Sequence, residues 1–373
     1  DTDVDTDTSG GENDTDTDAD GDTDADGDTD TDTDADADAD ADVDTGVSLP
    51  GDTGIDTGVS LPDTGVGKDS GAPADSGDSA PPADSGSPAD SGSPADSGGP
   101  ADSGDTGGSS SSVVRFVAVG DTGDGSPGQY AVAEGIETVC AAEGCDFVLL
   151  LGDNIYPGGV TTTTDPLWND VFEAPYADID LQFRPVMGNH DWDHTTDTAY
   201  LDAQIDYSAV STKWSMPSGY HATVEGDATF FGIDTHLVDM GEGAAQEAWL
   251  PSERASSTTT WNILYGHHPY LSNGPHGNAT GHVETFFDSY VCGEFDVYLC
   301  GHDHNLQWLE PSCGVELLVS GGGHSTYPVL GTNPSYFEME SLGFLWVEID
   351  GRSLTGVFYD DAGSELFRQT ITK

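Results

Sequence analysis

Short apolar runs recur along the second part of the chain, and each ends in glycine followed by a polar residue. The runs are 113–120, 147–152, 183–188, 261–266 and 295–301, followed by Asp121, Asp153, Asn189, His267 and His302. Runs of this length, rich in β-branched and aromatic residues, predict buried strands.

Helical periodicity occurs between these runs. The apolar positions of 129–142 fall on one helix face, and we expect further helices over 243–252 and 282–290. From residue 343 onward the pattern alternates as in an antiparallel meander. Strands mixed with crossover helices predict an α/β fold in which two mixed β-sheets pack as a sandwich flanked by helices.

Composition divides the chain into two parts. Residues 1–112 hold 32 of the 70 acidic residues, one base (Lys68) and no aromatic residue. Asp alternates with Thr or Ala there, and Pro-Ala-Asp-Ser-Gly repeats follow. Such a composition cannot bury enough apolar surface to offset the entropy of ordering the chain. We therefore predict a disordered acidic arm over 1–112 and one folded catalytic domain over 113–373.

The arm contains two segments, 16–21 and 22–27, that match the first half of a calcium-binding loop. The twelfth position of each loop would be Gly27 or Thr33, where such a loop needs a bidentate Glu. We expect a solvated polyelectrolyte that binds divalent cations loosely.

The charge excludes several kinds of partner. The formal net charge is −62, divided equally between the arm and the domain, so nucleic acid and anionic membrane surfaces would repel both. The sequence has no run of 18 apolar residues, so we expect no membrane span. A signal peptide is not visible in it, and if the protein is exported we expect the signal to have been removed. We expect a monomer.

Five cysteines lie in the folded part, at 140, 145, 292, 300 and 313. We expect two disulfides with Cys300 left over, although the pairing cannot be derived from the sequence. Disulfides imply an oxidising compartment, so the expected location is secreted, periplasmic or at the cell surface.

Residue types that bind metals occur at successive strand ends, where open α/β sheets place their sites. Each alone fits a turn, a helix cap or a core residue, but their recurrence favours a metal site. The candidates are Asp121, Asp153, Tyr156, Asn189, His267, His302 and His304.

Five ordered motifs carry a family resemblance: GDTG (120–123), GDNIY (152–156), GNHD (188–191), LYGH (264–267) and GHDH (301–304). They resemble the blocks of the purple acid phosphatases, within the calcineurin-like metallophosphoesterases. Segments 299–307 and 341–360 are similar to the small tartrate-resistant type. The resemblance implies an acid phosphatase that hydrolyses monoesters of small phosphorylated substrates by attack of a metal-bound hydroxide.

The resemblance also implies a dinuclear centre. It assigns Asp121, Tyr156 and His304 to Fe(III), Asn189, His267 and His302 to a divalent metal (Fe, Zn or Mn), and Asp153 to both as a bridge. A ferric ion favours carboxylate and phenolate oxygens, whereas imidazole suits the divalent ion. The alternative is an ordinary divalent pair with Tyr156 as a packing residue.

Two further histidines, His190 and His276, match family residues that contact the phosphate or assist the leaving group. Asp191 and His268 are expected to orient their neighbours, and His324 is not assigned to the site. Two other functions stay open: a phosphodiesterase or nucleotide pyrophosphatase with the same metals, and a non-enzymatic surface protein whose arm binds cations.

Overall fold

The computed structural model describes residues 113–373, so the predictions for the acidic arm lie outside the described residues. These residues form the two sheets and the helices that flank them. A bilayer-spanning helix is not found among the described residues, because every helix there is too short or too polar.

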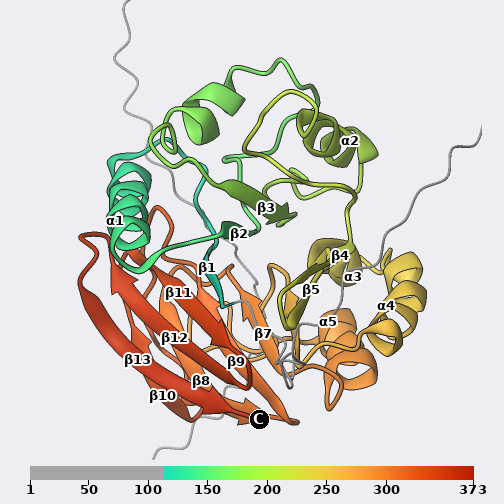
Figure 1. The fold of residues 1–373 in the computed structure, drawn as a ribbon. Coiled ribbons are helices and arrows are strands. Elements are labelled where there is room, and N and C mark those ends of the chain that lie inside the picture. Colours follow the sequence, from blue (N-terminus) through green and yellow to red (C-terminus); the bar gives the residue numbers. More distant parts are fainter. Residues whose placement is uncertain (1–112) are drawn as a thin grey trace, which may run out of the picture. The chain divides into compact units, whose positions relative to one another are not determined.

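The first sheet of this domain has six strands in the order β13-β12-β11-β1-β2-β3 (Figure 1). Its strands are β1 (Val114–Val119), β2 (Phe147–Leu151), β3 (Gln182–Val186), β11 (Gly343–Asp350), β12 (Ser353–Asp360) and β13 (Glu365–Thr372). The first three run parallel and the last three form an antiparallel meander joined to β1.

The second sheet, also within 113–373, has seven strands in the order β10-β8-β9-β7-β6-β5-β4. Its strands are β4 (His221–Glu225), β5 (Ala228–Gly232), β6 (Trp261–Tyr265), β7 (Val297–Cys300), β8 (Leu306–Ser312), β9 (Val315–Ser320) and β10 (Ser335–Met339). Strands β5, β6, β7 and β9 are parallel, and the outer strands pair antiparallel.

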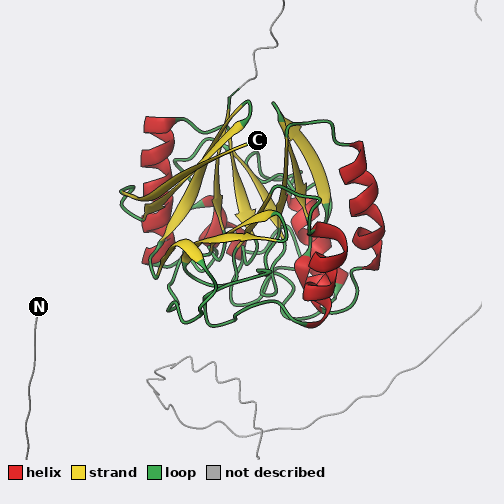
Figure 2. Cartoon of the chain, turned by 90° about the horizontal axis from the view of Figure 1, so that it is seen from below, coloured by secondary structure: helices red, strands yellow, loops and turns green. Residues whose placement is uncertain are grey.

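Helices cover the outer faces of the two sheets, as Figure 2 shows. They are α1 (Pro127–Glu143), α2 (Thr198–Tyr207), α3 (Thr235–Asp239), α4 (Ala244–Ser256) and α5 (Gly281–Phe286), with π-helical turns at Trp168–Glu173 and Phe287–Val291. Helix α1 starts where the sequence provides a cap: the Ser126 hydroxyl accepts from the Gln129 N–H and Pro127 opens the first turn.

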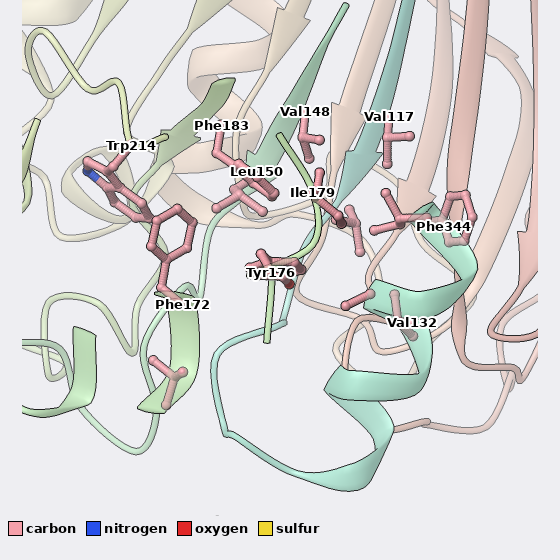
Figure 3. Close-up of a cluster of buried hydrophobic side chains, with 14 of the residues drawn as sticks. Val117, Val132, Val148, Leu150, Phe172, Tyr176, Ile179, Phe183, Trp214 and Phe344 are labelled. Carbon is pink, nitrogen blue, oxygen red and sulfur yellow. The ribbon is translucent and has the colours of Figure 1, made fainter. Parts of the chain in front are cut away.

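The apolar residues form three buried clusters. The central cluster fills the space between the sheets, where Phe116, Phe147 and Phe230 pack with ring centroids 5.1–5.4 Å apart. A second cluster joins α1 to the first sheet, and Figure 3 shows Val132 of α1 below Phe344 of β11, with Val117 and Val148 of the strands above. The third packs α4 and α5 against the second sheet. Alternate residues of the inner strands therefore face different clusters, which explains their continuous apolar pattern.

The main fold predictions are confirmed: the two-sheet sandwich, the five strands that precede the polar residues, and helices at 129–142 and 243–252. The helix predicted over 282–290 divides into α5 and a π-helical turn. The two expected disulfides join Cys140 to Cys145 and Cys292 to Cys313, and Cys300 is buried and free.

Candidate metal centre

The five predicted strand ends meet at one edge of the sandwich. Strands β1, β2 and β3 are parallel neighbours in one sheet, and β6 and β7 are parallel neighbours in the other. Parallel neighbours present their carboxyl ends at the same edge. The side chains that follow them are brought into contact, although they are far apart in the sequence.

Glycine is needed at the ends of these runs because atoms of another segment lie too close to its Cα for a Cβ to fit. A Cβ on Gly152 would lie 2.6 Å from Nδ1 of His267, and one on Gly301 would lie 2.5 Å from Oδ2 of Asp121. The residues that follow turn sharply: Asp121, Asp153 and His302 have φ values of 56°, 52° and 69°. Non-glycine residues adopt this left-handed region at a cost of about 1–3 kcal/mol, and such residues cluster at functional sites.

The first group of donor atoms surrounds the phenol of Tyr156. Its hydroxyl oxygen lies 3.0 Å from Oδ2 of Asp153 and 3.3 Å from Oδ1 of Asp121. Nε2 of His304 is also 3.3 Å from this phenol oxygen. Two carboxylates, a phenol and an imidazole therefore point to one place.

The second group surrounds the imidazole of His267. Its Nε2 lies 3.0 Å from Oδ1 of Asn189, 3.2 Å from Oδ2 of Asp153 and 3.2 Å from Nδ1 of His302. The same oxygen of Asp153 thus touches both groups. Asp153, His267 and His302 form a cluster that could hold a metal ion.

The buried charges of this site lack a basic partner. Asp121 and Asp153 are 0% and 1% exposed, and their ion pairs within residues 113–373 are with histidines rather than with Lys or Arg. Two buried carboxylates so close together are costly unless a cation compensates them. The donor set therefore fits cations held between the two groups.

Both the bridging carboxyl and the phenol have shifted pKa values. Burial acts to raise the pKa of Asp153, but the charge of His267 and the hydrogen bonds of His267 and His190 hold it well below its usual range. Burial, together with Asp153 and Asp121, raises the pKa of Tyr156 well above 10. This phenol would therefore ionise only beside a strong Lewis acid.

Hydrogen bonds behind the imidazoles fix which nitrogen faces the centre. Nδ1 of His267 donates to the Leu151 carbonyl at 2.9 Å, which leaves Nε2 for the donor cluster. Nδ1 of His304 lies 2.7 Å from the Ser325 hydroxyl. Such outer contacts orient metal-binding histidines in proteins.

The two predicted substrate-contacting histidines flank the donor atoms. The His190 N–H donates to Oδ1 of Asp153 at 2.9 Å, and its ring lies 4.5 Å from that of Tyr156. The ring of His276 lies 4.0 Å from that of His302.

Asp191 and His268 contact the loops that carry the donors. Asp191 is fully buried and accepts from the backbone N–H groups of Asn154 and Gly188, while burial, and next Asp153, raises its pKa to about 7. Nδ1 of His268 lies 2.9 Å from the Thr235 hydroxyl.

Two residues of the site were not assigned from the sequence. Asp303 lies between the two histidines of the last motif, is fully buried, and binds Nδ1 of His276 at 2.8 Å. His324 lies with its ring 4.8 Å from that of Tyr156 and donates to the Asp121 carbonyl. Asp303 could have been included because it lies inside the GHDH motif, whereas His324 follows a glycine run without any motif.

A cleft of about 400 Å³ opens beside the second group of donors. Its walls come from the loop after β3, the end of α3 and the segment before α5. They are lined by Asn189, His194, His236, Asp239, Met240, His268, Pro269, His276, Gly277, Asn278, Ala279, Thr280, Val283 and His302.

The sequence of this domain matches a known family. Residues 114–306, more than half of the chain, match the calcineurin-like phosphoesterase profile. The chain belongs to the calcineurin-like phosphoesterase family. This phosphoesterase is accordingly a hydrolase, a phosphatase with a metal centre, and it has the two-sheet sandwich of the family.

Relatives of this phosphoesterase include named acid phosphatases. Tartrate-resistant acid phosphatase type 5 of Mus musculus is 29% identical over 309 residues, which cover 72% of this chain and 93% of the relative. Purple acid phosphatase 3 of Arabidopsis thaliana is 28% identical over 288 residues, which cover 69% of this chain and 77% of the relative.

Solved structures show the same fold. The purple acid phosphatase PPD1 from yellow lupin (Lupinus luteus) seeds is similar with a TM-score of 0.57, 20% identity, and coverage of 70% of this chain and 54% of that one. GAP50, the anchor in the inner membrane complex of Plasmodium, is similar with a TM-score of 0.59 and 20% identity. The match covers 70% of this chain and 89% of GAP50.

Proposed function

We propose that this phosphoesterase is an acid phosphatase that hydrolyses phosphate monoesters at a centre of Fe(III) and a divalent metal, which is iron, zinc or manganese. The observation that carries the proposal is the Asp153 oxygen, which lies 3.0 Å from the Tyr156 phenol and 3.2 Å from the His267 imidazole. One carboxylate thus joins two donor groups of different chemistry.

The two groups divide between the metals by donor type. Asp121, Tyr156 and His304 would hold the ferric ion, because carboxylate and phenolate oxygens suit a hard trivalent cation. Asn189, His267 and His302 would hold the divalent ion, and Asp153 would bridge. When bound, the pair would supply Lewis acidity that activates water and binds phosphoryl oxygens.

The protein itself would supply orientation and proton transfer. His190, which is fixed to Asp153 through its backbone N–H, is placed to donate to a phosphoryl oxygen. His276 would protonate the leaving oxygen, because it stands at the cleft where the leaving group would lie.

The two disulfides support an oxidising compartment as the site of action. The complete set of seven donors is an argument against a protein that has lost its chemistry and serves only as an anchor or surface protein.

The test combines metal analysis, visible spectroscopy and kinetics on the purified chain. We expect iron in the protein, a tyrosinate-to-iron absorption band in its oxidised form, and loss of that band in Tyr156→Phe. We also expect acid-optimum hydrolysis of 4-nitrophenyl phosphate with little action on the bis ester. A colourless, iron-free preparation with full activity would contradict the ferric assignment, and faster cleavage of the diester would favour the phosphodiesterase.

A further inference from the structure

The cleft beside the second donor group lies where a leaving group would sit. It shares Asn189, His276 and His302 with the proposed centre and extends away from them between α3 and α5. A phosphoryl group held at the centre would therefore direct its ester substituent into this cleft. The chemistry of the cleft walls then decides which esters fit.

The walls combine apolar side chains with neutral polar ones. Met240, Pro269, Ala279 and Val283 provide apolar surface. Burial lowers the pKa of His236, and its Nε2 donates to the Thr195 carbonyl at 2.8 Å. Among the Asp, Glu, Lys and Arg side chains of residues 113–373, the wall holds that of the exposed Asp239 at the end of α3.

The cleft has no lysine or arginine in its wall, because the bases of residues 113–373 are engaged elsewhere. Four of them form ion pairs: Arg115 with Glu348, Arg184 with Glu225, Arg368 with Glu365, and Lys373 with Asp296. The other three donate to backbone carbonyls: Lys213 to Tyr176, Arg254 to Glu294, and Arg352 to Lys373. A second anionic group in the cleft would therefore meet Asp239 without a lysine or arginine beside it.

We infer that the substrates are monoesters of uncharged alcohols or phenols with an apolar part, an inference that rests on the proposed function. Esters whose leaving group carries a carboxylate or another phosphate are poor substrates. Asp239 would repel an anionic leaving group, and the apolar wall would favour an uncharged one. Specific binding sites commonly combine these two effects.

The test compares phenyl phosphate with 4-carboxyphenyl phosphate, which differ by one charge on the leaving group. We expect kcat/KM at least about tenfold lower for the carboxylated ester, as a like charge at close range near a protein surface requires. In Asp239→Lys the ratio of kcat/KM for phenyl phosphate to kcat/KM for the carboxylated ester should fall at least about threefold.

The matched control is Asp350→Lys, which makes the same change of charge at the opposite edge of the sandwich. Asp350 is exposed and ends β11 beside the first residues of β1, away from the centre. This control should leave the ratio of the two esters unchanged. Equal kcat/KM values for the two esters in the wild type, or equal effects of the two variants, would overturn the inference while the proposed function stands. Absence of any hydrolysis of phenyl phosphate by the metal-loaded protein would remove both.

Discussion

The Asp303 carboxylate fixes the orientation of His276. Its Oδ1 accepts from the His276 backbone N–H at 3.1 Å and binds the ring Nδ1 at 2.8 Å, while Oδ2 accepts from the Ser272 hydroxyl. A Cβ on Gly274 would lie 2.2 Å from Asp303, so the chain must pass very close to this carboxylate. The side chain of His276 is itself 41% exposed, and the buried acid is what holds it.

Replacement of this acid should weaken proton donation to the leaving group. In Asp303→Asn we expect kcat for phenyl phosphate to fall about 10–100-fold, with little change in KM, because the ring loses its charged partner. For 4-nitrophenyl phosphate, whose leaving group needs less help, the loss should be smaller.

The measurement is kcat across a series of aryl phosphates of graded leaving-group pKa, together with the metal content of the variant. A loss of equal size for every ester would mean that the substitution disturbs the centre and not His276.

Among individual site residues, the sequence predicts those that directly follow a strand. Asp121, Asp153 and His267 stand next to glycine at the end of an apolar run, so their positions follow from the strands themselves. His324 and Asp239 could not be predicted, because they reach the site through loop and helix packing. No local pattern records such long-range contacts.

Helix α3 is an element whose first turn depends on one buried acid. Asp234 caps the helix by accepting from the Leu237 N–H at 3.0 Å, and its other oxygen accepts from the Trp192 indole at 2.9 Å. Burial raises the pKa of this carboxyl from the ordinary 3.8 to about 7, although these hydrogen bonds lower it.

The raised pKa makes the stability of the domain depend on pH. The folded state binds the proton of Asp234 more tightly than the unfolded state does. The contribution of this protonated carboxyl to the free energy of unfolding is therefore complete below about pH 4 and is lost as the pH rises through about 7. It amounts to at most about 4 kcal/mol. Urea denaturation of wild type and Asp234→Asn between pH 4 and pH 8 should show a steeper fall for the wild type. Parallel curves would mean that Asp234 ionises freely in the folded protein.

The two disulfides stabilise different elements by different amounts. Cys292–Cys313 ties the turn after Phe287–Val291 to the β8–β9 hairpin across 21 positions, whereas Cys140–Cys145 closes a loop of 5 positions at the end of α1. Chain entropy predicts a loss of about 3 kcal/mol on replacing the first pair by serine, and about 2 kcal/mol for the second.

Chemical denaturation of the two double variants, Cys292→Ser with Cys313→Ser and Cys140→Ser with Cys145→Ser, tests this order. Both should retain kcat because neither pair contacts the donor atoms. A larger loss for the shorter loop would contradict the entropic explanation.

Among the elements, long periodic segments were predictable and short paired ones were not. Helix α1 has both a cap and a regular apolar face. The π-helical turn at Phe287–Val291 continues the periodicity of α5, so the two were expected as one helix. Strand β8 follows the GHDH motif without the glycine-bounded apolar pattern, and its pairing with β9 and β10 comes from the sheet.

The whole domain carries far more acid than base. Residues 113–373 contain 38 acidic residues and 7 bases, so surface carboxylates repel one another in the folded state. Added salt screens this repulsion, with a Debye length of about 10 Å at 0.1 M. We expect Tm to rise by about 5 °C between 10 mM and 0.3 M NaCl.

Differential scanning calorimetry at fixed pH measures this rise, and KCl at the same ionic strength serves as the control. A Tm that falls with either salt would mean that attractive ion pairs outweigh the repulsion.

The centre takes its donors from both sheets, and this has a consequence for biosynthesis. A nascent chain that has emerged only as far as the loop after β3 carries Asp121, Asp153 and Asn189 but none of the imidazoles that follow the strands of the second sheet. If the centre is the one proposed above, capture of both metals would wait until the ribosome has released His304 and the two halves have docked. Colour and activity would then appear together at the end of folding, so partly made chains would stay inert.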